Sequence, residues 1–496
     1  MQPFINVINY ILCFFLLFSV NVLAKDFHVN LKELSFDINN LLRLDIDGYM
    51  YMGPFYASSP HALAVSSTYS SSYRMGEVVT GFSVANGGRT IRPIRPYKRG
   101  NEFKDEYARV RPWFHLYVGD HLSFHSRIDF MTGRIGQGEN YNSNNVVDFG
   151  YFELKVKGYD IKLGMLSFYD PLNSDWGDPN NLVLANNGGM GINGNDYGEY
   201  WGHRSDGYEG VLVATDDVFK PLKLRLGYFN MGHKYFSDEI NVWTTEILYE
   251  FNQQTSLKLY EYVVMDKDNT QFPGLGGEDS RMYYTGVYLV DEPEPIGFTA
   301  NFVYLGGTTK LESRDLRRSA WASHFTLDYK LGKETLVGLK FTHTTGDNNP
   351  YDNNDNAWWG LDADYYETYM FYDYGWAETL NYQATVIDPN TGLKLGTNLV
   401  GPYLKTTVAF ISRNLKLDAG IYQIMTTKKS PERHGGNGNR NVGTEFDMTF
   451  EYFFTKQFSY LLELDYINVS DLYDDPSGYG RSPNAWAIGG FLFYYF

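Results

Sequence analysis

Charged side chains with a regular spacing are the residues of this sequence that could act on a solute. They alternate with apolar residues along short segments, and a period of two places the two kinds on opposite faces of a strand. The basic members are Arg111, Arg127, Lys155, Lys157, Lys162, Lys223 and Arg225. The acidic members are Asp45, Asp47, Glu445, Asp447, Glu451, Glu463 and Asp465.

The two sets occupy different parts of the chain, and the acidic segments become near neighbours if the sheet closes on itself. The spacing therefore predicts a wet, pore-lining wall with a basic and an acidic sector. Such a wall would orient polar solutes and favour charged or dipolar molecules over apolar ones. The alternative is that these charges pair with one another and only keep water in the lumen.

Histidines and loop carboxylates give a weaker case for chemistry. His115, His125, His324 and His343 all fall on expected strands, and no Ser/His/Asp grouping can be assembled from the sequence. We interpret them as ordinary wall residues and predict no enzymatic activity. No cofactor is predicted.

The long connection 345–402 is rich in side-chain oxygens. Asp347, Asp352 and Asp355 could ligate a hard cation such as Ca²⁺. Their spacing matches no fixed calcium loop, so a solvated loop is the preferred interpretation. Either this loop or 168–207 is expected to fold inward as a constriction, because loops of this length are usually functional.

The element that organises these segments is the final stretch, residues 484–496. Its alternate residues form an apolar row that ends on the last residue: Trp486, Ile488, Leu492, Tyr494 and Phe496. At a soluble sheet edge such a row would template aggregation, whereas in a closed barrel it can face lipid. The row resembles the insertion signal of bacterial outer-membrane barrels. The alternative is a buried edge strand of a soluble all-β domain.

The N-terminus predicts secretion. Residues 7–20 are apolar and Val22-Leu23-Ala24 offers a cleavage site, which indicates a signal peptide over 1–24. Because residues 2–24 contain no Lys or Arg, an uncleaved anchor is the alternative. The chain has one cysteine, Cys13, inside this segment, so disulfides and cysteine-ligated metals are excluded from the mature chain.

Composition agrees with a barrel. Aromatic residues make up 17% of the 496 residues, although the mean hydropathy is only -0.37. No later segment has the 18 or more apolar residues of a membrane helix. The net charge of -17 argues against a nucleic-acid partner.

Alternation also gives a strand count. The expected strands lie near 41–50, 108–118, 121–131, 147–157, 159–167, 208–215, 221–230, 242–251, 255–265, 282–290, 296–305, 320–330, 335–344, 403–411, 415–424, 443–453, 459–467 and from 484 onward. Their connections alternate between short turns and long loops, as in outer-membrane barrels. The pattern predicts an all-β, transmembrane, antiparallel up-and-down barrel of about 18 strands over 41–496, after a short periplasmic segment 25–40. Twenty strands is the alternative, using 369–386 and 76–84.

Three motifs resemble the alginate-export-like family of large outer-membrane barrels. They are Arg204-x-Asp206-Gly207-Tyr208-x-Gly210-Val211, His343-Thr344-Thr345-Gly346-Asp347-Asn348 and Gly443-x-Glu445-x-Asp447 with Tyr452. The resemblance implies an 18-stranded, porin-like barrel that passes solutes passively. It departs at Gly164-Met165-Leu166, where the family often has Gly-Arg-Gln, and in its mixed lumenal charge. We therefore do not predict alginate as the solute of this protein.

These observations predict a porin-like channel in the outer membrane of a diderm bacterium. Its solutes would be small polar or charged molecules or saccharides, moving by passive diffusion or export. Outer-membrane lipid, lipopolysaccharide and the barrel-assembly machinery are the expected partners. The alternative is a surface receptor or adhesin that binds through its long loops, with 51–107 or 345–402 plugging the barrel.

Overall fold

The fold was analysed in a computed structural model. It describes residues 27–30, 35–38, 42–58, 82–83, 90–91, 102–134, 146–166, 208–230, 240–266, 279–311, 314–349, 352–358, 381–382, 385–386, 388, 393–434, 436–473 and 484–495. The proposed signal peptide, the loop 168–207 and Phe496 lie outside these residues.

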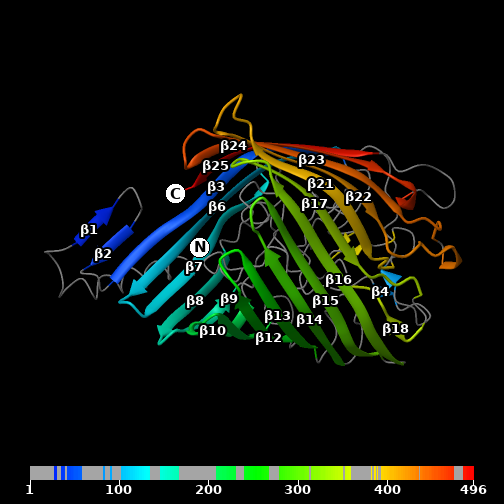
Figure 1. Cartoon of the computed structure of the whole chain (residues 1–496), viewed down its shortest axis with the longest axis horizontal. Helices are drawn as coiled ribbons and strands as arrows, with labels where there is room; N and C mark the ends of the chain where they lie inside the picture. The colour runs from blue at the N-terminus through cyan, green and yellow to red at the C-terminus, as the bar shows by residue number, and fades with distance from the viewer. Residues whose placement is uncertain are drawn as a thin grey trace.

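Eighteen strands form one closed antiparallel barrel, as predicted (Figure 1). They are β3 (Leu42–Ser58), β6 (Glu102–Val118), β7 (Leu122–Arg134), β8 (Val146–Val156), β9 (Tyr159–Leu166), β10 (Tyr208–Phe219), β11 (Leu222–Asn230), β12 (Ile240–Glu250), β13 (Thr255–Asp266), β14 (Asp279–Asp291), β15 (Ile296–Leu311), β16 (Arg314–Lys330), β17 (Thr335–Thr344), β21 (Thr397–Thr407), β22 (Leu415–Met425), β23 (Asn441–Phe453), β24 (Phe458–Val469) and β25 (Ala485–Tyr495). Each pairs with the next, and β25 pairs with β3 to close the ring.

The two faces of the barrel differ as the alternation requires. On β25, Trp486 and Ile488 are 41% and 39% exposed on the outer face, whereas Phe491 and Phe493 are buried on the inner face. Most charged residues of the strands lie on the inner face. The last strand is paired on both sides, with β24 and β3, so its interpretation as a soluble edge strand is wrong.

Several predicted boundaries are wrong: β15 continues to Leu311, β16 begins at Arg314 and β21 begins at Thr397. The strand expected at 403–411 ends at Thr407, because the chain turns at once, with Ile411 N–H bonded to the Val408 carbonyl at 2.9 Å. The turn leaves Phe410 89% exposed. The loop expected at 51–107 is shorter at both ends, because β3 and β6 remain paired as far as Ser58 and Glu102.

Short strands outside the barrel do not raise the count to twenty. β4 (Phe82–Ser83) pairs with β5 (Thr90–Ile91), and β19 (Asn381–Tyr382) with β20 (Thr385–Val386), each in a sheet of its own. In the described part of the chain, neither pair joins the ring. The remaining parts of 76–84 and 369–386 lie outside the described residues.

The segment before the barrel forms a small extension of the sheet. β1 (Phe27–Asn30) pairs with β2 (Ser35–Ile38), and β2 pairs with the first residues of β3 (Figure 1). β2 uses the stretch of β3 that lies beyond the end of β25, whose pairing stops at Tyr495 opposite Tyr49. Among the described residues, no helix is long and apolar enough to cross a membrane.

Candidate functional site

The basic residues of the wall are largely held by neighbouring groups. Arg127 is fully buried on the inner face and stacks over Trp113, with 5.2 Å between the guanidinium carbon and the ring centroid. Lys223 pairs with Glu250 at 2.9 Å, and Arg225 lies 3.6 Å from the carboxylate of Glu246. The basic sector is therefore partly neutralised by carboxylates on β12.

The remaining basic residues differ in position. Lys162 is buried beside Glu153 at 3.7 Å, whereas the side chain of Lys155 is 62% exposed and 3.5 Å from the same carboxylate. Lys157 lies in the turn between β8 and β9 and has a φ of 51°, so it belongs to a barrel mouth rather than to a strand. The side chain of Arg111 lies outside the described part of the structure.

The acidic residues divide into two groups. Glu445, Asp447, Glu463 and Asp465 are buried on the inner face of β23 and β24, with Asp447 directly opposite Asp465. Glu451 is also buried there and accepts a hydrogen bond from Ser459 at 2.7 Å. The second group lies on β3, the strand that pairs with β25 to close the ring. There Asp45 pairs with Arg43 at 3.0 Å, and the Asp47 side chain is 60% exposed.

A polar network that sequence reasoning did not find lies near the β6–β7 turn. The Nδ1 atoms of His115 and His125 are 2.7 Å apart, and His125 Nε2 is 2.7 Å from Ser123 Oγ. Ser123 donates to Glu153 at 3.1 Å, and Asp47 lies 3.4 Å from His115. The turn has three residues, Gly119 to His121, and places His115 opposite His125, whereas the strand limits expected at 118 and 121 would have placed Phe124 there.

A cavity of about 410 Å³ opens beside this network. Its lining residues include Arg43, Tyr117, His121, Ser123, Glu153 and Lys155. Because it lies beside the β6–β7 turn, a solute that enters from the short-turn mouth meets charges of both signs there. His324 and His343 lie elsewhere and bond Thr342 and Asn398, respectively.

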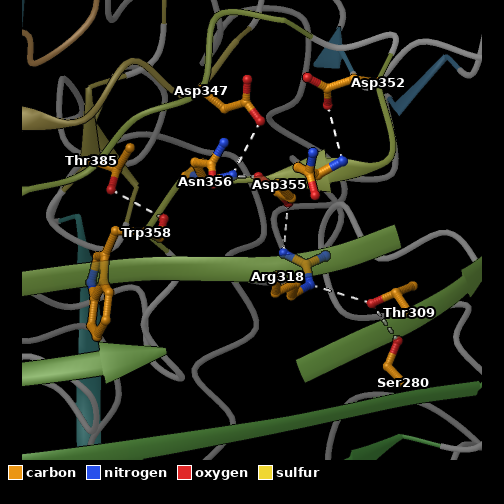
Figure 2. Close-up of polar contacts among 11 residues, drawn as sticks. Ser280, Thr309, Arg318, Asp347, Asp352, Asp355, Asn356, Trp358 and Thr385 are labelled. Carbon is orange, nitrogen blue, oxygen red and sulfur yellow. Dashed lines mark hydrogen bonds and ion pairs between the residues drawn. The ribbon is translucent and has the colours of Figure 1, made fainter. Parts of the chain in front are cut away.

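The loop after β17 returns alongside β16, at residues that β17 leaves unpaired (Figure 2). β18 (Asn354–Asp355) runs parallel to β16, where Arg318 Nη1 donates to Asp355 Oδ2 at 2.8 Å. Trp358 is fully buried and packs edge-on against Tyr284 of β14, with ring centroids 5.8 Å apart. Thr385 also donates to the Trp358 carbonyl at 3.2 Å. The Trp358 ring of this loop therefore covers the inward-facing side chain of Tyr284.

The proposed calcium ligands have other roles in this loop. Asp347 accepts hydrogen bonds from the Asn349 and Asn356 backbone amides, and Asp352 from the amide of Asn354 (Figure 2 shows both carboxylates). Asp355 is paired with Arg318. In the described ranges, no group of three or more His, Cys, Asp or Glu residues could hold a metal ion. These carboxylates shape turns.

The same loop buries an amine. Lys394 is 4% exposed, and its carbonyl accepts a hydrogen bond from the Asp347 amide at 2.7 Å. Burial lowers the pKa of Lys394 well below its ordinary value. The carboxylate of Asp355 opposes this decrease, and the charge of Arg318 adds to it. The loop is thus held by buried polar groups.

The arrangement defines a class of protein, the large closed antiparallel barrel with a polar interior. Scans against protein-family models and against curated proteins find no match. Among solved structures, Pseudomonas aeruginosa OccK2 (OpdF) is similar at a TM-score of 0.51 and 10% identity, covering 91% of this chain and 97% of that chain.

Pseudomonas aeruginosa OccK8 (OprE) is similar at a TM-score of 0.50 and 10% identity, covering 91% of this chain and 98% of that one. A BenF-like porin from Pseudomonas fluorescens Pf-5 has a TM-score of 0.48 and 10% identity, covering 91% and 98%. At these identities the first two likenesses show the fold alone.

Proposed function

We propose that this protein is a porin-like channel of the outer membrane, through which small polar or charged solutes or saccharides diffuse. The observation that supports it is the closed ring of eighteen strands with an apolar outer face and a charged inner face. Eight strands suffice for a barrel filled by its own side chains, whereas 16 to 18 leave a water-filled channel. A wall of buried Arg, Lys, Asp and Glu would be costly around a dry interior.

The location follows from the outer face. Exposed aliphatic and aromatic residues on the outer face suit lipid, and closure satisfies the backbone where water is absent. The proposed partners are therefore outer-membrane lipid, lipopolysaccharide and the barrel-assembly machinery, after secretion directed by residues 1–24. The row Trp486, Ile488, Leu492, Tyr494 and Phe496 would be the insertion signal. The channel has no proposed enzymatic role.

The finer family proposal is the alginate-export-like group. Two of the motifs coincide with strand ends, since Tyr208 begins β10 and Thr344 ends β17. The wall does not favour a strongly anionic polymer, because Glu246 and Glu250 offset the cations of β11. We therefore propose the passive transport role without alginate as the solute.

A second candidate is a surface receptor or adhesin with a closed lumen. The loop that buries Trp358 against Tyr284 favours it, because the same loop could seal the barrel. Single-channel conductance in planar bilayers separates the two functions. We expect discrete current steps in KCl and swelling of proteoliposomes in small sugars and amino acids. Protein that inserts and never conducts would contradict the channel and favour the receptor.

A further inference from the structure

We infer that the inner wall of β22–β24 is a binding site for an organic cation, a solute that carries ammonium or guanidinium groups. The inference rests on the proposed channel function and names the solute class for one sector of its wall. The site consists of five carboxylates, defined here as the carboxylate cluster: Asp418, Glu445, Asp447, Glu463 and Asp465.

Strand register brings these carboxylates together. Asp447 of β23 lies directly opposite Asp465 of β24. Thr449 lies between Asp418 of β22 and Glu463 of β24, in one row across three strands. All of them are on the inner face, and none is more than 3% exposed. The cluster therefore concentrates negative charge on one sector of the inner wall.

A buried cluster of like charges is unstable unless something compensates it. Both carboxylate oxygens of Asp465 are buried without a hydrogen-bond partner. The hydroxyl of Thr449, an uncharged group in the middle of the cluster, is likewise unpartnered. At the edge of the cluster, Lys405 Nζ is 3.9 Å from Asp418, and the charge of Lys340 also acts on this carboxylate. A donor from outside the chain would satisfy these groups.

The layout suits an extended organic cation better than a metal. Metal ions need ligands that converge on one point, and among the described residues no such group of His, Cys, Asp or Glu occurs. The carboxylates instead spread over three strands, and neighbouring strands are about 4.8 Å apart, so the outer members are separated by roughly 10 Å. Ammonium and guanidinium groups can donate to several carboxylates in sequence along such a wall.

The neighbouring side chains add an aromatic surface and space. Gly420 lies opposite Asp447, and a Cβ built at Gly420 would be 2.3 Å from the hydroxyl of Tyr422, so that ring covers the glycine. On the other side, Ala487 lies opposite Asp465 and Gly489 opposite Glu463. Lys340 Nζ lies 5.7 Å from the centroid of the Tyr422 ring, which shows that this ring accepts a cation, and no long side chain of β25 lies directly opposite Glu463 or Asp465.

Calorimetric titration of the detergent-purified full chain tests the site. Putrescine and agmatine are the probes, and succinate and CaCl₂ are the comparison ligands. We expect saturable binding of both amines, weakened at least tenfold in Asp465→Asn. Because that variant removes a buried charge and keeps the shape, folding should persist, which the electrophoretic shift on heating verifies. The matched control is Glu292→Gln, an exposed carboxylate in the β14–β15 turn, and it should bind as the native chain does.

Three results would overturn the inference. They are equal amine binding by Asp465→Asn, binding of Ca²⁺ but not of the amines, and binding of nothing, which would mean that protons alone neutralise the cluster. Planar-bilayer recordings keep this outcome separate from the channel proposal. Conduction of KCl without block by putrescine would support the channel and contradict the cation site. Binding of putrescine without conduction would support the cation site and contradict the channel.

Discussion

Arg318 and Asp355 form a buried ion pair, with Nη1 and Oδ2 2.8 Å apart and side chains 1% and 5% exposed. Arg318 belongs to the wall strand β16, and Asp355 to the loop that leaves β17. Next to them, the Arg317 amide bonds the Asn353 carbonyl at 2.8 Å. The pair is therefore one of the contacts that fasten the inward loop to the barrel.

Removing one partner should release this loop. Arg318→Leu leaves the Asp355 carboxylate buried and unpaired, which costs about 3–5 kcal/mol in comparable sites. We expect faster proteolysis between residues 345 and 358, with the barrel still folded. Limited proteolysis in detergent measures the rate. Arg317→Leu is the matched control, because Arg317 is exposed on the opposite face. Equal cleavage rates in both variants would show that the ion pair does not hold the loop.

Trp358 should narrow the lumen. Trp358→Ala removes a fully buried ring from its contact with Tyr284, at a cost of about 3–5 kcal/mol if the site cannot collapse. We expect a larger single-channel conductance, because space next to β14 becomes available to ions. Trp321→Ala removes an exposed ring from the outer face and should leave conductance unchanged. A conductance that moves only in the Trp321 variant would place the constriction elsewhere.

The strands were predictable, whereas the inward loop was not. A period of two depends on one face meeting an apolar environment and the other water, so segments such as 335–344 could be bounded from the sequence. Trp358 has no such pattern, because its burial depends on Tyr284, a residue on a strand several positions around the ring.

The ion-pair partners of individual charged residues also could not be predicted from the sequence. The alternation places Arg225 on the inner face but does not show that Glu246, on the next strand, lies 3.6 Å away. Cross-strand pairing depends on register, which a sequence determines only where a tight turn fixes it. Even for His115 and His125 the expected strand limits give a register that is wrong by one residue, because the turn has three residues, Gly119 to His121.

The exposed lysines of the basic sector should influence ion selectivity. Lys155 and Lys157 lie near one mouth of the barrel and are exposed, so reversing both to Glu should leave the fold intact. We expect the reversal potential in a KCl gradient to move toward cation selectivity. The shift should shrink at high salt, because charges are screened over about 10 Å at 0.1 M. Lys333→Glu, in the β16–β17 turn, is the single-charge control. An unchanged potential would mean that these charges only solvate the mouth.

Closure of the ring should depend on Gly53. A Cβ at this position would lie 1.8 Å from the Gly490 carbonyl oxygen, across the β3–β25 seam. Gly53→Val should therefore separate the two strands and destabilise the barrel by at least about 1–3 kcal/mol, as overpacking does. Urea unfolding in detergent measures the loss. Gly150→Ala is the control, since a Cβ there meets no atom closer than 3.7 Å. Equal stability of the two variants would argue against a tight seam.

The outer face of β25 should require lipid. Ile488 is 39% exposed between Trp486 and Leu492, and it pairs across the sheet with Leu464 and Tyr56. Ile488→Arg places a charge in the apolar band, where Arg costs about 2–4 kcal/mol at the bilayer midplane. We expect a smaller folded fraction in liposomes but normal folding in detergent, because detergent lets the guanidinium reach water. Ala487→Ser, one residue away on the inner face, should fold normally in both. If Ile488→Arg inserted into liposomes as well as the control does, this face would not meet hydrocarbon, and the membrane channel would lose its physical basis.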